Sequence, residues 1–408
     1  MKILVFNSGS SSQKSALFEL DHKSGADPVP PLWEGRLEWD GDAETLTIQS
    51  SQGKKTREER KRVPAHHQAA VKTMLGSLWN GDTAVLSSPA EVDAIGHRIV
   101  HGGSRLTEPV TITPQVERAI SDVSEIAPLH NKAGLAGIEI AQNLFPHKLQ
   151  IAVFDTGFHR TLPKYAAVYP GPYKWYEQNV RRYGFHGINH QYCAHRTAQL
   201  LQRDLSSLKI VSCHLGNGCS LAAIDGGKSI DTTMGFTPLE GLMMGTRAGS
   251  IDPGILIHLM RTQRAGADEL DSILNHDSGL LGISGVSSDM RDVLEAANKG
   301  DARSILAFDI FIHRLQTGIA AMAASLGGVD ALVFTAGIGE NSAEVRSASC
   351  AKLKFLGIHL DGEKNASAEP DLDIAASDSR VHILVIRAQE DWAIARECMR
   401  LYHTPGQP

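Results

Sequence analysis

Two arginines lie in glycine-rich segments that carry few other charges. Arg98 stands in the segment His-Arg-Ile-Val-His-Gly-Gly, and Arg247 in Met-Met-Gly-Thr-Arg-Ala-Gly. A guanidinium group is planar and binds carboxylate and phosphoryl oxygens through paired hydrogen bonds. An arginine beside glycine is most often a surface residue, so a surface position is the alternative for each one alone. Beside phosphate-binding loops, both would be suited to neutralising an anionic substrate.

Three glycine-rich turns follow apolar, strand-like runs, at residues 7–12, 216–220 and 337–341. Clustered glycine and serine supply unhindered N–H groups and hydroxyls, which suit a loop that wraps phosphate oxygens. The alternative is a tight hairpin turn, with Gly9 at a positive φ in the first. None of the turns completes a P-loop or a Rossmann fingerprint. Together they predict a nucleotide site, and the third leads into a helix expected to begin at Ala343.

Asp155 and His186 are candidates for catalysis on different grounds. Asp155 follows the apolar run 148–154, and ligands of α/β proteins gather at the carboxyl ends of strands. Such a carboxylate could serve a metal or catalysis, with a helix cap as the alternative. His186 lies in the segment Tyr-Gly-Phe-His-Gly, where the alternative is a hydrogen-bonded core histidine. The chain has 18 histidines, so residue type alone selects none of them.

The elements that would carry these residues show an internal repeat. A strand, a Gly/Ser turn and a second strand open each half of the chain, at 3–6 with 13–20 and at 209–215 with 221–224. The repeat predicts two related domains built by duplication. Residues 21–63 are expected to form a hairpin or surface excursion. The rest is mixed α/β, with strands expected at 87–99, 148–154, 331–334 and 381–386, and helices at 114–126, 133–144, 190–201, 253–260, 290–298, 301–326 and 391–401.

The composition is that of a globular protein with sizeable cores. The 408 residues and the mass of 44.0 kDa correspond to two or three domains. A net charge of -6 and a pI near 6.3 provide no basic surface for nucleic acid or an anionic membrane. No apolar run suits a signal peptide or a membrane span, so we expect a cytoplasmic protein. The five scattered cysteines predict buried free thiols rather than disulfides or zinc ligands.

Taken together, the motifs resemble those of the acetokinase family, the acetate kinases. The resemblance implies two duplicated ribonuclease-H-like α/β domains of the actin, sugar kinase and Hsp70 superfamily, with a nucleotide cleft between them. The implied domains are residues 1–152, joined by the C-terminal helix at 388–408, and residues 153–387. Family members are typically homodimers that use Mg²⁺, or Mn²⁺, to transfer phosphate between ATP and acetate, giving acetyl phosphate and ADP. The matching residues, in the family's order, are 7–14, 97–103, 127–131, 154–159, 183–187, 214–218, 245–247, 251–254 and 337–341.

The resemblance also implies roles for individual residues. The metal site is expected at Asn7 and Glu390, and the catalytic residues are expected to be Asp155, His186 and Arg247. Acetate is expected to bind Arg98, with its methyl group in a pocket formed by Val100, Leu129, Phe185 and Pro238. The residues expected to contact ATP are Lys14, His214, Leu215, Gly216, Asn217, Gly218, Asp289, Met290, Arg291, Gly337, Ile338, Gly339, Glu340 and Asn341.

The chemistry explains why positive charge is needed. Acetate is already ionised at pH 7, so it needs no general base, and the difficulty lies in bringing one anion up to another. Asp155 therefore suits an orienting or metal-water role better than that of a base. A pocket separates acids that differ by one methylene by only about 1 to 3 kcal/mol, so propionate should be a poorer but real substrate.

Two alternatives remain at this stage. One is a kinase for propionate or another short carboxylate. The other is a non-catalytic nucleotide switch of the same superfamily, which explains the loops but gives no reason for Arg98, Arg247 and His186 to occur together with an apolar pocket. The chain also departs from the family pattern. Ser8 and Gln13 replace the usual Cys or Ala and Leu, and Ala-Gln-Glu-Asp at 388–391 replaces Thr-Asn-Glu-Glu next to the expected metal site.

Overall fold

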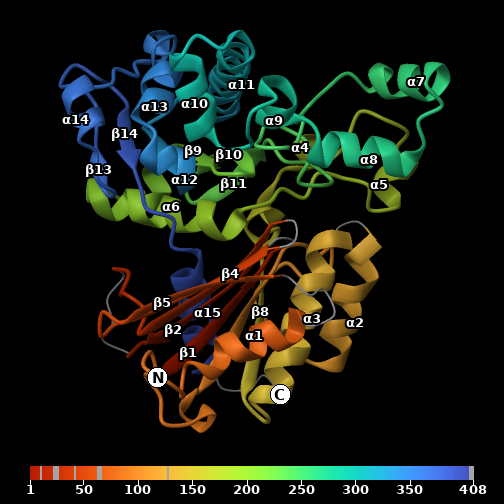
Figure 1. Cartoon of the computed structure of the whole chain (residues 1–408). Helices are drawn as coiled ribbons and strands as arrows, with labels where there is room; N and C mark the ends of the chain where they lie inside the picture. The colour runs from red at the N-terminus through yellow and green to blue at the C-terminus, as the bar shows by residue number, and fades with distance from the viewer. Residues whose placement is uncertain (10–11, 22–26, 41–42, 62–66, 126–127, 404–408) are drawn as a thin grey trace. The chain divides into compact units, whose positions relative to one another are not determined.

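Two compact units make up the chain (Figure 1). The computed structural model describes residues 1–9, 12–21, 27–40, 43–61, 67–125 and 128–403, without the side chains of residues 40, 60, 61, 67, 125 and 128–130. Unit 1 comprises Met1–Gly157 together with Gln389–Pro408, and unit 2 comprises Phe158–Ala388. Each unit is built on its own mixed sheet with helices on both faces.

In the described part of unit 1, eight strands form one sheet in the order β5-β4-β3-β2-β1-β6-β8-β7. Strands β1, β6 and β8 run parallel, and the other pairs are antiparallel. The strands are β1 Lys2–Ser8, β2 Ser12–Glu19, β3 Trp33–Asp40, β4 Ala43–Ser50, β5 Lys55–Lys61, β6 Ala94–Ile99, β7 Val110–Thr111 and β8 Leu149–Phe154. The helices are α1 His67–Gly76, α2 Pro114–Asp122, α3 Pro128–Leu144 and α15 Glu390–Tyr402.

The two faces of strand β1 pack against different elements. Leu4 and Phe6 point into a core that includes residues of α1 and α3. Val5 and Asn7 point the other way, toward α15, because side chains alternate along a strand. Gly96 on β6 lets α15 approach closely, since a side-chain carbon there would lie 2.6 Å from Cγ2 of Ile394 and 2.7 Å from Sγ of Cys398. Helix α15 therefore lies on the face that carries Asn7.

In the described part of unit 2, six strands form a sheet in the order β11-β10-β9-β12-β14-β13. Helix α6 packs against β9 and β12, and α11 packs against β9, β10 and β11 on the opposite face (Figure 1). The strands are β9 Lys209–Leu215, β10 Cys219–Asp225, β11 Lys228–Thr232, β12 Ala331–Thr335, β13 Leu372–Asp373 and β14 His382–Val385. The helices are α4 Lys164–Ala167, α5 Lys174–Glu177, α6 Gly187–Leu201, α7 Pro253–Thr262, α8 Ala267–His276, α9 Gly279–Ser284, α10 Met290–Asn298, α11 Ala302–Leu326, α12 Ala336–Asn341, α13 Ala343–Cys350 and α14 Gly362–Ala366.

The two sheets share one topology, which confirms the predicted internal repeat. In unit 1 the antiparallel strands β3, β2 and β1 continue into the parallel strands β6 and β8. In unit 2 the antiparallel strands β11, β10 and β9 continue into the parallel strands β12 and β14 in the same way. Strand β1 of unit 1 therefore corresponds to β9 of unit 2, and the carboxyl ends of these two strands occupy the same place in each sheet.

Several sequence-based expectations need correction. Residues 21–63 are more than a surface excursion, because β3, β4 and β5 extend the sheet and Trp33 and Leu37 pack against α1. The many charged residues in this part of the sequence had suggested a solvent-exposed excursion. The strand expected at 87–99 begins only at Ala94, after a 3₁₀ turn at Pro89–Glu91. Gly9 does not have the positive φ expected of a tight hairpin turn. Its N–H donates to the Ser12 carbonyl oxygen at 2.8 Å.

The third glycine-rich segment is a helix rather than an open turn. Residues Ala336–Asn341 form α12, and the following helix α13 begins at Ala343, as predicted, with the Ser342 side chain accepting from the N–H of Val345. The short spacing of Gly337 and Gly339 suggested a turn. Two hydrogen bonds from Arg346 hold this segment as a helical turn, and contacts of that kind carry no signature in the local sequence.

The five cysteines are free and buried, as predicted. Among the described helices, α11 is long and apolar enough to cross a membrane by length and composition alone. One side of it is buried in unit 2, including Phe311 and Leu315, while the exposed side carries Asp309 and His313. We therefore interpret α11 as a core helix of unit 2.

Two buried polar side chains where β1 pairs with β2 satisfy each other. Ser8 and Gln13 are paired across strands β1 and β2, and both are buried. The Ser8 hydroxyl donates to Oε1 of Gln13 at 2.6 Å, and Nε2 of Gln13 donates to the Lys14 carbonyl oxygen at 2.9 Å. Each polar group would be costly to bury alone. The Ser8–Gln13 contact therefore offsets the cost of burying both groups.

Candidate functional site

In unit 1, three residues expected to act in the site lie at the carboxyl ends of the three parallel strands. Asn7 is near the end of β1, Arg98 near the end of β6, and Asp155 directly follows β8. The register pairs Asn7 with Arg98, so both side chains lie on the same face of the sheet. Because parallel strands end at a common edge, the fold brings these three residues together.

Arg98 is held by a bidentate ion pair. Its Nε donates to both carboxylate oxygens of Asp155 at 3.1 Å, and its Nη2 donates to Oδ2 of the same residue. Its Nη1 donates to Oδ1 of Asn7 at 3.0 Å. The Asp155 side chain is 1% exposed. A guanidinium has five N–H donors, so one on Nη1 and one on Nη2 remain for a ligand.

Helix α15 adds Asp391, which the sequence analysis did not single out. Nδ2 of Asn7 donates to Oδ1 of Asp391 at 2.9 Å. The amide of Asn7 is therefore fixed at both ends, with its nitrogen toward Asp391 and its oxygen toward Arg98. The two residues are 384 positions apart, so nothing local in the sequence announces the contact. The one available signal was the neighbouring Glu390 in the first turn of the helix.

Negative charge exceeds positive charge in this part of unit 1. Burial raises the pKa of Asp155 and of Asp391, and the charge of Glu390 adds to both shifts. Burial and the charge of Asp391 raise the pKa of Glu34 as well. The pKa of the Arg98 guanidinium is pushed down by burial, but the carboxylates of Asp155 and Glu390 raise it above its ordinary value overall. The cluster thus favours an additional cation.

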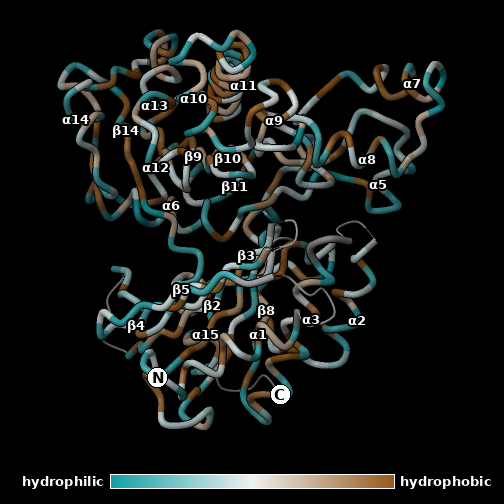
Figure 2. Tube along the Cα trace, in the orientation of Figure 1, coloured by the Kyte–Doolittle hydropathy of each residue, from teal (hydrophilic) through white to brown (hydrophobic). Residues whose placement is uncertain are grey.

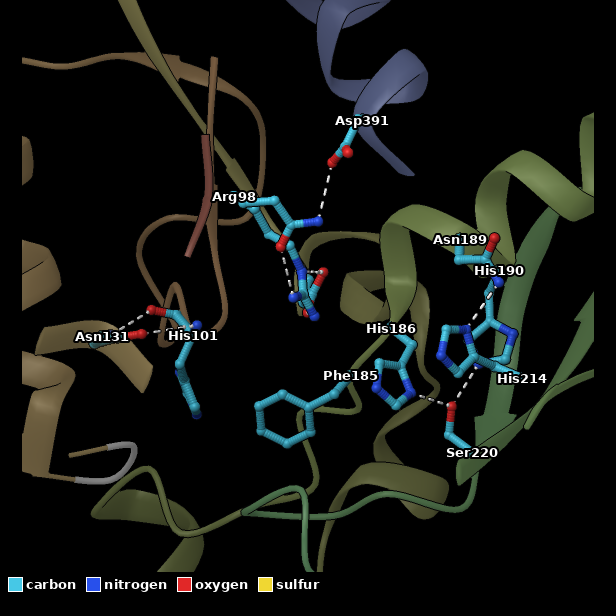
Figure 3. Close-up of polar contacts among 12 residues, drawn as sticks. Arg98, His101, Asn131, Phe185, His186, Asn189, His190, His214, Ser220 and Asp391 are labelled. Carbon is cyan, nitrogen blue, oxygen red and sulfur yellow. Dashed lines mark hydrogen bonds and ion pairs between the residues drawn. The ribbon is translucent and has the colours of Figure 1, made fainter. Parts of the chain in front are cut away.

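The remaining candidates of unit 1 have different settings. Lys14 is opposite Asn7 in the β1–β2 register, with an exposed side chain. Val100 is 7% exposed, in a segment held by Asn131, whose amide bonds the backbone N–H and carbonyl of His101 (Figure 3). The Leu129 side chain lies outside the described residues, so its place in the expected pocket stays a prediction.

In unit 2, Arg247 and His186 converge on Gly218. A side-chain carbon added to Gly218 would lie 2.7 Å from Nη2 of Arg247 and 3.4 Å from Nε2 of His186. The segment containing Arg247 is tied to the same loop, because the N–H of Gly245 donates to the Asn217 carbonyl oxygen at 3.1 Å. Glycine at 218 thus leaves room for a cation and an imidazole beside the turn that follows β9.

Arg247 differs from Arg98 in having no carboxylate within ion-pair distance among the described residues. Its Nη1 donates to the Pro238 carbonyl oxygen at 2.6 Å. Burial lowers the pKa of the Arg247 guanidinium from its ordinary value, although an arginine stays protonated at neutral pH. A partly desolvated cation without a counter-ion is a site for an anion.

The loop that carries Pro238 is held by a polar network that the sequence analysis missed. Arg182 donates from Nη2 to Oε1 of Glu240 at 2.6 Å and from Nη1 to the Thr233 carbonyl oxygen at 3.0 Å. The Tyr169 hydroxyl donates to Glu240 and accepts from the N–H of Phe236 at 2.8 Å. These contacts fix the carbonyl group that orients Arg247.

The glycine-rich turn after β9 lies beside two stacked histidines. The rings of His186 and His214 are 3.9 Å apart and inclined by 15° (Figure 3). Nδ2 of Asn189 donates to Nδ1 of His214 at 2.8 Å, so neutral His214 carries its proton on Nε2. That nitrogen would lie 3.9 Å from a side-chain carbon added to Gly216.

The other expected nucleotide residues of unit 2 form two separate groups. Asp289 caps α10 by accepting from the N–H of Arg291 at 2.8 Å, and it pairs with the Arg291 side chain, which is 88% exposed. The α12 segment is fixed by Arg346, a 2% exposed residue that the sequence analysis missed. Nη1 of Arg346 donates to the carbonyl oxygens of Gly339 at 3.0 Å and Glu340 at 2.8 Å.

Comparison with known proteins supports both the fold and the family. The crystal structure of Porphyromonas gingivalis acetate kinase superposes with a TM-score of 0.89 at 38% identity, covering 98% of this chain and 99% of that one. A propionate kinase from Francisella tularensis gives a TM-score of 0.88 at 37% identity with the same coverage. Among curated relatives, an acetate kinase from Gloeobacter violaceus is 56% identical over 98% of each chain, and one from a Cyanothece strain is 54% identical over the full length of both.

The fold and these neighbours define a two-domain α/β protein of the actin and sugar kinase type. A model of the acetokinase family matches residues 2–396. The chain belongs to the acetokinase family.

Proposed function

We propose that the chain catalyses the reversible, direct transfer of the ATP γ-phosphoryl group to acetate, giving acetyl phosphate and ADP. Family membership over residues 2–396 and relatives named acetate kinases at more than 50% identity support this activity. The observation that carries the chemistry is the Arg247 guanidinium, which has no carboxylate partner in the described part of the chain and converges with His186 on Gly218. A fixed positive charge at that place can stabilise the charge on a transferring phosphoryl group.

Arg98 is the proposed binding group for the acetate carboxylate. Three of its donors hold Asp155 and Asn7, and the two that remain fit a carboxylate in a paired geometry. Asp155 then acts as the residue that orients Arg98 rather than as a base, because acetate has no proton to give up at pH 7. Val100, Leu129, Phe185 and Pro238 are proposed to surround the methyl group.

Mg²⁺ is the proposed metal, with Mn²⁺ as a substitute, and the unit 1 cluster fits such an ion. Mg²⁺ is usually held by one or two carboxylates together with substrate phosphates, so a large protein ligand set is not required. Glu390 supplies a carboxylate, and Asn7 supplies an amide oxygen with one lone pair not used by Arg98. The raised pKa values of Asp155 and Asp391 agree with a cluster that lacks positive charge. When bound, the ion would neutralise phosphate oxygens.

The nucleotide is proposed to bind Lys14 and the three segments of unit 2 that the family resemblance marked. We propose that these segments are His214 to Gly218, Asp289 to Arg291 and Gly337 to Asn341. The first has the two imidazoles and Arg247 beside it, as phosphate oxygens would require. The domains are proposed to be residues 1–152 with 388–408 and residues 153–387, and the proposed location is the cytoplasm.

The proposed activity predicts a ranking of acids. With Mg-ATP, hydroxylamine-trapped acyl phosphate should form fastest with acetate and more slowly with propionate. Butyrate should be slower again, and the reaction without acid should give none. One extra methylene changes binding to an apolar pocket by about 1 to 3 kcal/mol, or roughly 10- to 200-fold in kcat/KM. An absence of product with every acid, although ATP binds, would contradict the activity.

Propionate is the second candidate substrate, and the Francisella propionate kinase favours it. That protein is 37% identical to this chain and covers 98% of it, so the fold accommodates either acid. A kcat/KM for propionate above that for acetate would decide for this alternative. The same assay therefore separates the two substrates.

A homodimer is proposed, and α7 is the face that supports it. No residue of α7 is buried, although Ile255, Ile257 and Met260 are 46%, 49% and 51% exposed. Figure 2 shows hydrophobic residues on this helix, which stands out from the rest of unit 2. An amphipathic helix with nothing covering its apolar side is typical of a surface that another protein covers.

The dimer can be tested by changing one residue of α7. In light scattering after size exclusion, the wild-type protein should have twice the 44.0 kDa chain mass, and Ile257→Asp should shift it toward the monomer. Phe355→Asp is the matched control, because Phe355 is 71% exposed in the separate 3₁₀ turn Lys354–Leu356. A monomeric wild type, or a dimer that Ile257→Asp leaves intact, would contradict this interface.

A further inference from the structure

A buried chain of hydrogen bonds extends from His186 into unit 2. Nδ1 of His186 lies 2.9 Å from Oγ of Ser220, which lies 2.8 Å from Nε2 of His190. Nδ1 of His190 in turn lies 2.9 Å from Oγ of Ser212. Ser212, His190 and Ser220 are all 0% exposed. Figure 3 shows the contacts of Ser220 with both imidazoles.

The local structure explains why these groups meet. His186 immediately precedes α6 and His190 follows one turn later, with its N–H donating to the His186 carbonyl oxygen at 3.0 Å. Ser212 and His214 are two residues apart on β9, so their side chains share the face that α6 covers. Ser220 on β10 is paired with His214 and therefore points the same way.

His190 can donate a hydrogen bond to only one of its two serine partners, Ser212 and Ser220. Burial, together with the neighbouring His159 and His214, lowers the pKa of His190 well below its ordinary value, so the ring is neutral. A neutral imidazole donates through one nitrogen and accepts through the other. His190 therefore cannot donate to Ser212 and Ser220 at once. When His190 donates from Nε2 to Ser220, the buried Ser220 hydroxyl keeps its own proton for Nδ1 of His186, its other hydrogen-bond partner.

The surroundings of Ser212 decide that direction. Besides His190, the Ser212 hydroxyl contacts the thiol of Cys193. Burial raises the pKa of that thiol to about 12, so it stays protonated, and its sulfur lies 3.8 Å from Oδ1 of Asn189. A thiol sulfur is a weak acceptor, whereas an imidazole nitrogen is a strong one. The Ser212 proton therefore points to Nδ1 of His190.

We propose that Ser212, His190 and Ser220 are positioning residues that hold neutral His186 with its proton on Nε2. Ser212 donates to His190, His190 donates from Nε2 to Ser220, and Ser220 donates to Nδ1 of His186. The Nε2–H then lies beside Gly218, next to Nη2 of Arg247. The inference rests on the proposed function, in which His186 and Arg247 lie together beside Gly218, and it assigns His186 the role of donating a hydrogen bond to the transferring phosphoryl group.

A neutral donor suits the charges that surround His186. Arg247 lies beside it, His214 is stacked on it, and the thiol of Cys219 lies near Arg247. A protonated imidazole next to the guanidinium would be repelled by it. With the tautomer fixed by the chain, His186 offers an N–H to a phosphoryl oxygen without a second positive charge.

The test reads the proton position of His186 directly. Nitrogen-15 NMR spectra of the full-length protein with labelled histidine, assigned by comparison with His186→Asn, should show His186 neutral with its proton on Nε2. Ser220→Ala should release the ring to a mixture of tautomers. It should lower kcat by about 10- to 100-fold, the usual loss for a residue that orients a functional group, with little change in the KM values for ATP and acetate.

Two further variants control for general effects of a serine-to-alanine change on folding, and neither needs kinase activity as its readout. Ser212→Ala leaves the His186–Ser220 contact in place but removes the donor that sets the direction, so it should also mix the tautomers. Ser229→Ala breaks a similar buried contact, between Ser229 and Nδ1 of His159 at 2.7 Å, and should leave the His186 signals unchanged. A wild-type proton on Nδ1, or an unchanged tautomer in Ser220→Ala, would overturn the inference. A protein without kinase activity would still give the tautomer.

Discussion

Arg247→Ala should lower kcat for acetate-dependent phosphoryl transfer by about 10³- to 10⁵-fold, the range found for arginines that stabilise a transferring phosphoryl group. Arg247 has no carboxylate partner among the described residues, so its charge is available to the transition state. ATP binding should persist, because other groups of unit 2 remain beside the turn after β9. Steady-state kinetics and a nucleotide-binding titration would measure the two effects separately.

Two variants control this result. Arg247→Lys keeps a positive charge but loses the planar pair of donors, so it should recover only part of the rate. Arg203→Ala removes an arginine of the same unit whose Nη1 pairs with Asp330 at 3.2 Å in an exposed setting, and it should leave kcat unchanged. A rate for Arg247→Ala within a few-fold of wild type would contradict the role assigned to Arg247.

Arg98→Ala should damage both stability and acetate binding. The change leaves the 1% exposed carboxylate of Asp155 without its bidentate partner. Breaking a buried ion pair from one side costs about 3 to 5 kcal/mol. The unfolding free energy of unit 1 should fall by that order, and the KM for acetate should rise together with a loss of kcat. Thermal or denaturant unfolding and acetate titration of the rate would measure these effects.

A second substitution separates the two consequences of losing Arg98. In the double variant Arg98→Ala/Asp155→Asn, the buried charge is gone, so much of the stability should return while the activity stays low. If activity returned along with stability, Arg98 would have only a structural role. If Arg98→Ala alone were as stable as wild type, the ion pair would not contribute as described.

The sequence predicted the parts of the site that depend on strand ends. The apolar run before Asp155 placed that residue at a strand end, whereas Asn7 and the role of Arg98 came from the family resemblance. The register of the parallel strands then brings the three residues together. The internal repeat was visible because each half begins with the same strand, turn and strand. These features depend on patterns within short stretches of sequence, so they can be recognised without knowing how the rest of the chain packs.

The missing parts depend on contacts between distant segments. Asp391 meets Asn7 because α15 returns to β1, and the neighbouring Glu390, expected from the family resemblance, was the one sign of this contact across 384 positions. Ser212 and Ser220 resemble ordinary strand residues until α6 covers them and places His190 between them. Arg346 turns a glycine-rich segment into the helix α12 by binding its carbonyl groups. In each case packing of separate elements, rather than local propensity, decides the outcome.

The central claim is that Mg-ATP and acetate are converted to ADP and acetyl phosphate with the help of Arg247. The most direct measurement is the ratio of ADP released to acetyl hydroxamate trapped, followed in wild type and in Arg247→Ala with and without acetate. Wild type should give one hydroxamate for each ADP and no ADP without acetate, and Arg247→Ala should form both products about 10³- to 10⁵-fold more slowly. ADP release without hydroxamate, or bound ATP that is never consumed, would contradict the central claim and favour a nucleotide switch.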